Sequence, residues 1–269
     1  MGRQHATRVE AAPQAIFGLD GRVAFVSAAP GHLGAAITRA LCAAGAHVIV
    51  NARDDAKLSV FEAGLLGEGF SVERAAFDVA DVAKARSFFA GRDRLDILVN
   101  NAIHMEGRSF DAVQPSDFAA TYASGVTAAF EMVRAARPAL KASGRASVVN
   151  VSSMYGLVSP DRRLYAKPEG QSPFHYGPAK AALIQLTRHL AAELGGENIR
   201  VNALVPGPFP RTEVQQIDPE FAARLAARTM LGRLGEAHEI AGPLLFLASD
   251  ASSFMTGQAL TVDGGWTAW

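Results

Sequence analysis

Tyr176 and Lys180 are the residues of this sequence whose types and spacing point most directly to acid–base chemistry. They lie four positions apart in the apolar-periodic run FHYGPAKAALIQLTRHLAAEL, which predicts a helix with both side chains on one face. A phenol has an ordinary pKa of about 10, and a neighbouring ammonium group favours its ionised form. The pair could therefore exchange a proton near neutral pH, although two such residues can also share a solvated helix face without any chemistry.

A glycine-bearing segment, Ser27 to Gly34, follows a short apolar run and leads directly into a helix-like pattern. It reads A-x-x-G-x-x-G, with Ala28 in the first position and Gly31 and Gly34 in the others. Such a turn presents backbone amides and a helix N-terminus, which together favour a pyrophosphate group. The segment predicts a dinucleotide site, with a plain tight turn as the alternative.

Arg53 closely follows the second apolar run, where a ribose 2′ substituent would lie. The carboxylate that would favour NAD is missing, since Ala52 occupies that place, and an arginine suits a 2′-phosphate. The alternative is an ordinary surface arginine beside two aspartates. Asp78 ends the third apolar run and could hold an adenine amino group, and Asn101 and Ala102 end the fourth.

The composition excludes several classes of protein. Lys and Arg number 26, equal to Asp and Glu, so no overall field attracts nucleic acid or an acidic membrane. The one cysteine, Cys42, cannot form an internal disulfide, which fits a reducing compartment and cytoplasmic localisation. No apolar stretch approaches the roughly 20 residues of a membrane span, and the histidines show no metal-ligand spacing. We expect neither a metal nor a nucleic-acid partner.

These residues must be positioned by an alternation of short β-branched runs and longer helical patterns. Strands are expected at 22–28, 46–52, 72–78, 95–102, 146–153, 200–205 and 259–263. Helices are expected at 32–44, 55–66, 82–90, 115–142, 178–194, 219–228 and 237–248. Apolar residues on both faces of the strands predict an α/β fold: a Rossmann-type, doubly wound parallel sheet of about seven strands with helices on both faces. We expect one domain, residues 19–269, after a flexible lead-in, residues 1–18.

From Leu19 to Gly265 the chain resembles the classical short-chain dehydrogenase/reductase family. The resemblance runs in order through the glycine turn, FDVAD at Asp78, LVNNA, VVNVSSMYG at Ser153, the Y-x-x-x-K pair, IRVNALVPGPF and the segment ending VDGGW. It implies an NAD(P)-dependent oxidoreductase with NADP as cofactor and NAD as the alternative. It also implies a homotetramer or homodimer, with residues 115–142 and 178–194 and the C-terminal segment as contact surfaces.

The resemblance also assigns roles to individual residues. The catalytic set is Ser153, Tyr176 and Lys180: Tyr176 exchanges a proton with the substrate oxygen, Ser153 hydrogen-bonds that oxygen, and Lys180 binds the nicotinamide ribose and lowers the Tyr176 pKa. The implied cofactor-binding residues are Ser27, Gly31, His32, Leu33, Gly34, Arg53, Asp78, Val79, Asn101, Ala102, Tyr176, Lys180, Pro206, Gly207 and Phe209.

The chain departs from the family pattern at several positions. Ala28 and His32 stand in the glycine turn, and a methyl group at Ala28 is costly if that position needs a positive φ. Ile103 replaces the glycine of N-N-A-G. Gly125 stands where the family usually has an asparagine that positions a relay water. The glycine predicts a kink or a space filled by another group, and for a redox enzyme we expect Gly125→Asn to be tolerated.

The interval between Ser153 and Tyr176, 22 residues, is longer than usual in the family. Its polar, proline-punctuated stretch, SPDRRLYAKPEGQSPFH (Ser159–His175), predicts a loop over the substrate end. Candidate substrate contacts there are Arg162, Arg163, Tyr165, Lys167 and His175, with a solvated loop face as the alternative. The layout is similar to that of family members acting on sugars or other polyhydroxylated substrates.

Three functional hypotheses follow. The first is an oxidoreductase transferring hydride between NADP(H) and the carbonyl or alcohol group of a small, polyhydroxylated or sugar-like substrate. The second is a non-redox enzyme of the same fold, a dehydratase, isomerase or cyclase that uses the Tyr–Lys pair. The third is a cofactor-sensing or scaffold protein, against which the complete set of Ser153, Tyr176 and Lys180 argues.

Overall fold

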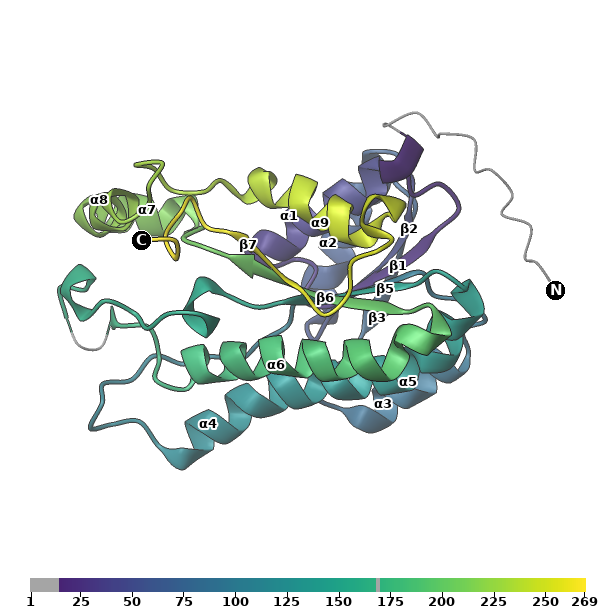
Figure 1. The fold of residues 1–269 in the computed structure, drawn as a ribbon, viewed down its shortest axis with the longest axis horizontal. Helices are drawn as coiled ribbons and strands as arrows, with labels where there is room; N and C mark the ends of the chain where they lie inside the picture. The colour runs from purple at the N-terminus through teal and green to yellow at the C-terminus, as the bar shows by residue number, and fades with distance from the viewer. Residues whose placement is uncertain (1–14, 168–169) are drawn as a thin grey trace.

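The computed structural model describes residues 15–167 and 170–269, which form a seven-stranded sheet covered by helices on both faces (Figure 1). The strand order is β3-β2-β1-β4-β5-β6-β7, and every neighbouring pair is parallel. The strands are β1 (Val23–Val26), β2 (His47–Ala52), β3 (Val72–Ala76), β4 (Ile97–Asn100), β5 (Ser147–Val151), β6 (Arg200–Pro206) and β7 (Ala259–Val262). The predicted fold class is confirmed.

Most of the α-helices cover the two faces of this sheet (Figure 1). The α-helices are α1 (His32–Ala43), α2 (Asp55–Gly67), α3 (Val82–Ala90), α4 (Pro115–Tyr122), α5 (Ala128–Ser143), α6 (Tyr176–Leu194), α7 (Thr212–Ile217), α8 (Pro219–Ala227) and α9 (Ala241–Ala248). Of these, α7 and α8 lie beyond one end of the sheet. Side chains of α3, α5 and α6 share one apolar core with the sheet, and those of α1, α2 and α9 share another, as Figure 1 shows. Burial on both faces explains why the central strands are apolar throughout.

Helix boundaries differ from expectation mainly around the site. The helix expected at 115–142 is divided into α4 and α5 by a π-helical turn, Ala123–Thr127. Helix α6 begins at Tyr176, two residues before the expected Pro178, so the tyrosine occupies the first helical position. Helix α7 is absent from the sequence-based assignment, since six residues are too short a run for periodicity to reveal.

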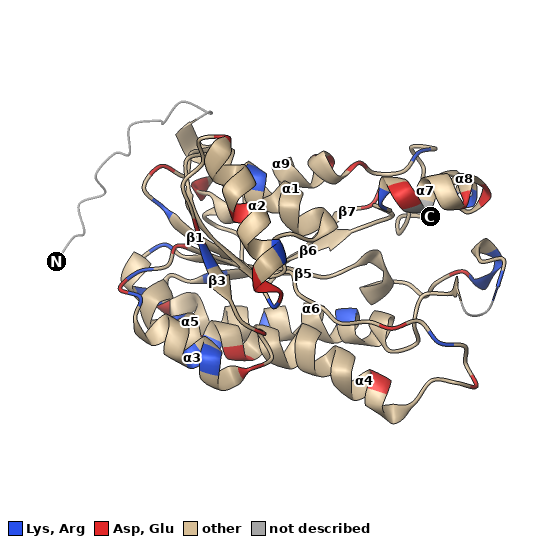
Figure 2. Ribbon diagram, turned by 180° about the vertical axis from the view of Figure 1, so that it is seen from behind, with Lys and Arg blue, Asp and Glu red and all other residues tan. Residues whose placement is uncertain are grey.

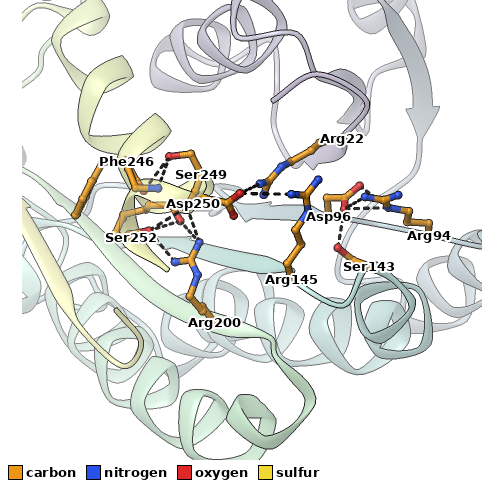
Figure 3. A network of polar contacts seen from close by, with 12 residues as sticks. Arg22, Arg94, Asp96, Ser143, Arg145, Arg200, Phe246, Ser249, Asp250 and Ser252 are labelled. Atoms are coloured by element: carbon orange, nitrogen blue, oxygen red, sulfur yellow. Dashed lines mark hydrogen bonds and ion pairs between the residues drawn. The ribbon is translucent and has the colours of Figure 1, made fainter. Parts of the chain in front are cut away.

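Ion pairs hold the amino-terminal ends of the central strands. Figure 3 shows Arg22 and Arg145 reaching Asp250, with nitrogen–oxygen distances of 2.7 and 3.4 Å. Beside them, Asp96 accepts hydrogen bonds from Arg94 and from Ser143. Elsewhere, basic and acidic residues are interspersed over the ribbon seen in Figure 2, as the balanced composition implies. These contacts leave the carboxyl ends of the strands free for ligands.

The expected N-terminal lead-in, residues 1–18, lies mostly outside the described residues. Residues 15–17 are described and form a short 3-10 helix, Ala15–Phe17. Leu19, just after them, is fully buried. Within the described residues, none of the helices has the length and apolar character needed to cross a membrane.

Candidate active site

Two adjoining recesses follow the carboxyl ends of the strands. The inner recess, about 330 Å³, is lined by Ser153, Tyr176 and Lys180 among others. The outer recess, about 310 Å³, lies over the ends of β2 and β3. Both include Ala28, Gly31 and Ile103, so the two form one continuous groove across the glycine turn. This is the edge at which a doubly wound sheet binds ligands.

Ser153, Tyr176 and Lys180 meet in the inner recess as the sequence predicts. Ser153 follows β5, and Tyr176 and Lys180 occupy the first turns of α6 on one face. Lys180 is 3% exposed, and its ammonium donates a hydrogen bond of 2.7 Å to the Val151 carbonyl oxygen and lies 5.6 Å from the Tyr176 ring centre. Helix α6 thereby fixes the position of the Tyr176 phenol relative to the Lys180 ammonium group.

Burial governs the electrostatics of this set. It raises the pKa of Tyr176, and a hydrogen bond with Ser153 acts in the opposite direction. It also lowers the pKa of Lys180 to about 7. The sequence argument assumes that a charged lysine favours the phenolate. It therefore overestimates the effect of Lys180 on the Tyr176 pKa, because the amine is only partly charged near neutral pH. In this structure Ser153 is the group that lowers the pKa of the phenol.

The glycine turn has the strained backbone expected from its sequence. Ala28 adopts a φ of +50°, a left-handed conformation that glycine reaches without cost. A Cβ on Gly34 would lie 2.3 Å from the Ala28 carbonyl oxygen, so only glycine allows α1 to pack this closely. The first amides of α1 follow Gly31, which has no capping side chain and leaves them available to an anion.

His32, the first residue of α1, carries a further polar atom toward the inner recess. Its Nε2 is buried and has no hydrogen-bond partner among the described residues. Burial, followed by the charge of Arg211, lowers the pKa of the imidazole. A buried polar atom without a partner is costly, so this atom marks a place where a ligand would complete the structure.

Ser27 is the one predicted cofactor residue that does not line the groove. Its hydroxyl is buried beneath the turn, where it donates to the Val99 carbonyl oxygen and accepts from the amides of Asn101 and Ala102. The side chain therefore joins the ends of β1 and β4. Its side chain thus supports the turn from beneath; the other fourteen predicted residues all line one of the two recesses.

The outer recess holds the predicted Arg53 and Asp78, together with a residue that the sequence analysis missed. Arg53 Nη1 lies 3.7 Å from Asp78 Oδ2, and both side chains are largely exposed. Lys57, one turn into α2, lines the same recess. The spacing of Arg53 and Lys57 could have indicated this second cation, because α2 begins between them. Two cations here suit a phosphate better than one.

The groove fits a dinucleotide by these observations: an open helix N-terminus, an unpartnered buried imidazole nitrogen and a continuous path from Arg53 to Lys180. The turn before α1 could hold the pyrophosphate, Arg53 and Asp78 the adenosine half, and Lys180 the second ribose. Among the described residues, no group of three His, Cys, Asp or Glu side chains is placed to hold a metal ion.

Gly125 and Ile103 form a complementary pair beside the inner recess. Gly125 is buried in the π-helical turn, and a Cβ there would lie 3.0 Å from Cδ1 of Ile103. Ile103 therefore occupies the space in front of the glycine. Ser124 also has a defined role: its hydroxyl accepts from the His104 amide at 2.9 Å. The space expected at Gly125 is filled by an apolar side chain, and the expectation that asparagine is tolerated there is revised.

We expect Gly125→Asn to lower the free energy of unfolding by about 1–3 kcal/mol, because Ile103 must leave its rotamer or its place. Ile103→Gly combined with Gly125→Asn should recover most of that loss, whereas Ile103→Gly alone leaves a void. Urea unfolding of the four proteins in this cycle measures the coupling. Additive losses, or a Gly125→Asn protein as stable as the parent, would show that the two side chains are independent.

The loop residues proposed as substrate contacts lie away from the inner recess. Arg163 pairs with Asp161 and is 86% exposed, and Arg162 is exposed in the same 3-10 turn. Lys167 lines a different recess beside α8. His175 is buried and hydrogen-bonded to Thr121 and to the Glu106 carbonyl oxygen. Residues 168–169 of this loop lie outside the described part of the chain.

Tyr165 keeps a connection to the site through Tyr155, which the sequence analysis did not single out. Their hydroxyl groups are 2.9 Å apart. Burial raises the pKa of Tyr155, and the neighbouring phenols Tyr165 and Tyr176 act in the same direction. Tyr155 therefore lies near both Tyr165 and Tyr176, without lining the inner recess. The M-Y-G tripeptide after Ser153 was the available signal for Tyr155.

Comparison with known proteins decides the family. Residues 28–267 match the family model described as Enoyl-(Acyl carrier protein) reductase, a branch of the short-chain dehydrogenases/reductases. The chain belongs to the short-chain dehydrogenase/reductase family. The resemblance noted from Leu19 to Gly265 is confirmed, and the protein is an NAD(P)-dependent oxidoreductase of that family.

Three relatives show what this chain is similar to. Galactitol 2-dehydrogenase (L-tagatose-forming) of Cereibacter sphaeroides is 38% identical over 94% of this chain and 98% of its own length. A rhamnolipids biosynthesis 3-oxoacyl-[acyl-carrier-protein] reductase of Pseudomonas aeruginosa is 34% identical over 93% and 97%. The crystal structure of a gluconate 5-dehydrogenase from Burkholderia cenocepacia, in complex with NADP and tartrate, has a TM-score of 0.85 at 32% identity and covers 96% of this chain and all of its own.

Proposed function

We propose that this enzyme transfers hydride between NADP(H) and the carbonyl or alcohol group of a small substrate in the inner recess. The observation that carries the proposal is the convergence of Ser153, Tyr176 and Lys180 at the end of a groove that fits a dinucleotide. Bound NADPH supplies the hydride from its nicotinamide. The named relatives are dehydrogenases or reductases, which favours redox chemistry over the dehydratase, isomerase or cyclase alternative.

The roles of the side chains follow from their positions. In reduction, the Tyr176 hydroxyl gives its proton to the substrate oxygen as that oxygen gains charge. Ser153 donates a hydrogen bond to the same oxygen, and the Tyr176 hydroxyl regains a proton afterwards. Lys180, held at Val151, places a positive charge beside the phenol whenever its amine is protonated. In oxidation the same groups act in reverse.

NADP is the proposed cofactor, with NAD as the alternative, because Arg53 and Lys57 line the outer recess. We expect Arg53→Gln to weaken NADPH binding by about 1–3 kcal/mol, which is roughly 5- to 150-fold in Kd, while NADH binding changes little. Fluorescence titration with each cofactor measures both constants. Lys84→Gln, on the neighbouring helix α3 and outside both recesses, is the matched control. Equal losses for the two cofactors would mean that Arg53 does not meet the 2′-phosphate.

The proposed substrate is polyhydroxylated or sugar-like. A galactitol dehydrogenase and a gluconate dehydrogenase crystallised with tartrate support this class. The loop arginines that were predicted as substrate contacts do not support this substrate class, because Arg163 is paired with Asp161 and is exposed to solvent.

The test uses NADPH carrying deuterium at the transferable position of its nicotinamide. The enzyme is incubated with a panel of ketoses, keto-sugar acids and 3-oxoacyl thioesters, and products are analysed by mass spectrometry. The proposal predicts one deuterium on the new carbinol carbon of a ketose or keto-sugar acid. Deuterium found only in the products of the 3-oxoacyl thioesters would contradict a sugar-like substrate and indicate an oxoacyl substrate instead. Product formation without deuterium would favour the non-redox alternative.

We also propose a cytoplasmic homo-oligomer, a tetramer or a dimer. Exposed aromatic side chains on the expected contact surfaces support it: Phe130 on α5 and Phe254 before β7. Large exposed apolar side chains in such positions are typical of subunit contacts. Light scattering of the purified protein tests the assembly, and a monomer at micromolar concentration would contradict it.

A further inference from the structure

Residues 103–106 form one wall of the inner recess. Ile103 and Met105 line the recess, whereas the backbone of His104 and Glu106 is held from behind. The His104 amide donates to Ser124 Oγ at 2.9 Å, and Thr121 Oγ1 donates to the His104 carbonyl oxygen at 2.8 Å. Both partners belong to α4 and the π-helical turn, so the wall is attached to that part of the structure.

His175 provides the third attachment. Its side chain is 1% exposed, and its Nε2 lies 3.1 Å from the Glu106 carbonyl oxygen. Its Nδ1 lies 2.8 Å from Thr121 Oγ1. His175 is also the residue before Tyr176 and the N-cap of α6, which runs beside α4 (Figure 1). One imidazole thus connects the wall, α4 and the start of the helix that carries the proposed proton donor.

Counting protons shows what this arrangement requires. The Thr121 hydroxyl has one proton, which it donates to the His104 carbonyl oxygen, so toward His175 it can only accept. The Glu106 carbonyl oxygen can also only accept. Both ring nitrogens of His175 must therefore carry a proton for all three contacts to form. A neutral imidazole has a single N–H and must give up one of them.

The charged surroundings of His175 come from three elements. On α4, Asp117 has a pKa lowered chiefly by the Gln114 amide and also by the charges of Arg108 and His175. Arg108 lies within 3.1 Å of both Asp117 and Glu106, which balances those carboxylates. His104 on the wall and Tyr176 on α6 are the other titratable neighbours along the chain, and the Phe118 ring packs edge-on against the imidazole.

We propose that His175 is a positioning residue that holds the 103–106 wall against α4 and α6 through both of its ring nitrogens. The inference rests on the proposed function, because the wall belongs to the proposed substrate site. When one of these attachments is lost, Met105 and Ile103 are less firmly placed. Substrate KM should then rise, while kcat changes little.

Nuclear magnetic resonance tests the proton count without any substrate. Protein labelled with ¹⁵N only in histidine shows for each ring whether one or both nitrogens are protonated, and His175→Gln identifies the signal. We expect both ring nitrogens of His175 to carry a proton in the folded protein, because each faces an acceptor. A His175 with a single ring N–H would overturn the proposal, whether or not the enzyme proves to be a reductase.

Kinetics test the connection to the wall. Thr121→Val keeps the side-chain shape and removes the hydroxyl; we expect KM to rise about 5- to 20-fold, with kcat changed less than about twofold. Thr121→Ser should restore the parent KM. Ser71→Ala, which removes an exposed hydroxyl paired with His47 at the other end of the sheet, is the control. A KM of Thr121→Val within about twofold of the parent value would contradict the proposal.

Discussion

Replacing Tyr176 by phenylalanine is expected to lower kcat by about 10²-fold or more, because the substrate oxygen then has no proton donor. The ring remains, so the start of α6 and the fold should be unchanged. NADPH affinity should stay within about twofold of the parent, since Lys180 and the groove are intact. Steady-state kinetics and a cofactor titration measure the two effects.

Tyr165→Phe is the matched control, because it removes a hydroxyl that pairs with Tyr155 rather than one in the inner recess. It should leave kcat within about twofold of the parent. Near-normal turnover by Tyr176→Phe would exclude the proton-transfer role, and a large loss of stability in that variant would leave its kinetics attributable to misfolding.

The second large effect is expected at Lys180, where activity and stability should change in opposite directions. In Lys180→Met, turnover should fall by at least about 10²-fold, because the charge beside the phenol is lost. The fold without added cofactor should become more stable by about 2–4 kcal/mol at pH 6, because a buried amine no longer has to be charged. Urea unfolding and kinetics on the same preparation measure both.

The pH dependence of the stability gain in Lys180→Met shows whether the loss of a buried charge causes it. The Lys180 pKa is about 7 in the folded protein, below its ordinary value of 10.5. Between these pH values the unfolded chain binds more protons, so stability rises with pH from about 7 to 10.5, and the penalty is fully present below pH 7. The gain from Lys180→Met should therefore shrink from pH 6 to pH 10. A gain of the same size at both pH values would point to packing instead of charge.

Much of the fold could be predicted from the sequence because the strands are buried on both faces. The expected run 146–153 contains β5, Ser147–Val151, in which every residue is buried, and all seven strands appear in the expected order. What periodicity could not show is the local widening at Ala123–Thr127, since one extra residue in a turn leaves the apolar spacing almost unaltered.

The site divides in the same way. Residues brought together by short-range spacing, Tyr176 and Lys180, were predictable, and so was the strain at Ala28. The depth at which Lys180 is buried could not be predicted from the sequence. For this reason the pKa of Lys180 differs from expectation. His175 was expected in a solvated loop, but its partner Thr121 lies 54 positions away, and only the packing of α4 beside α6 brings them together.

The central claim is that this groove binds NADP(H) and delivers it to Tyr176. Titration of the protein with NADPH and with NADH, followed by the fluorescence of the reduced nicotinamide, tests it most directly. The account predicts saturable binding of both, with NADPH bound at least about tenfold more tightly, and a loss of that preference in Arg53→Gln. Failure of the folded protein to bind either cofactor at millimolar concentration would contradict it.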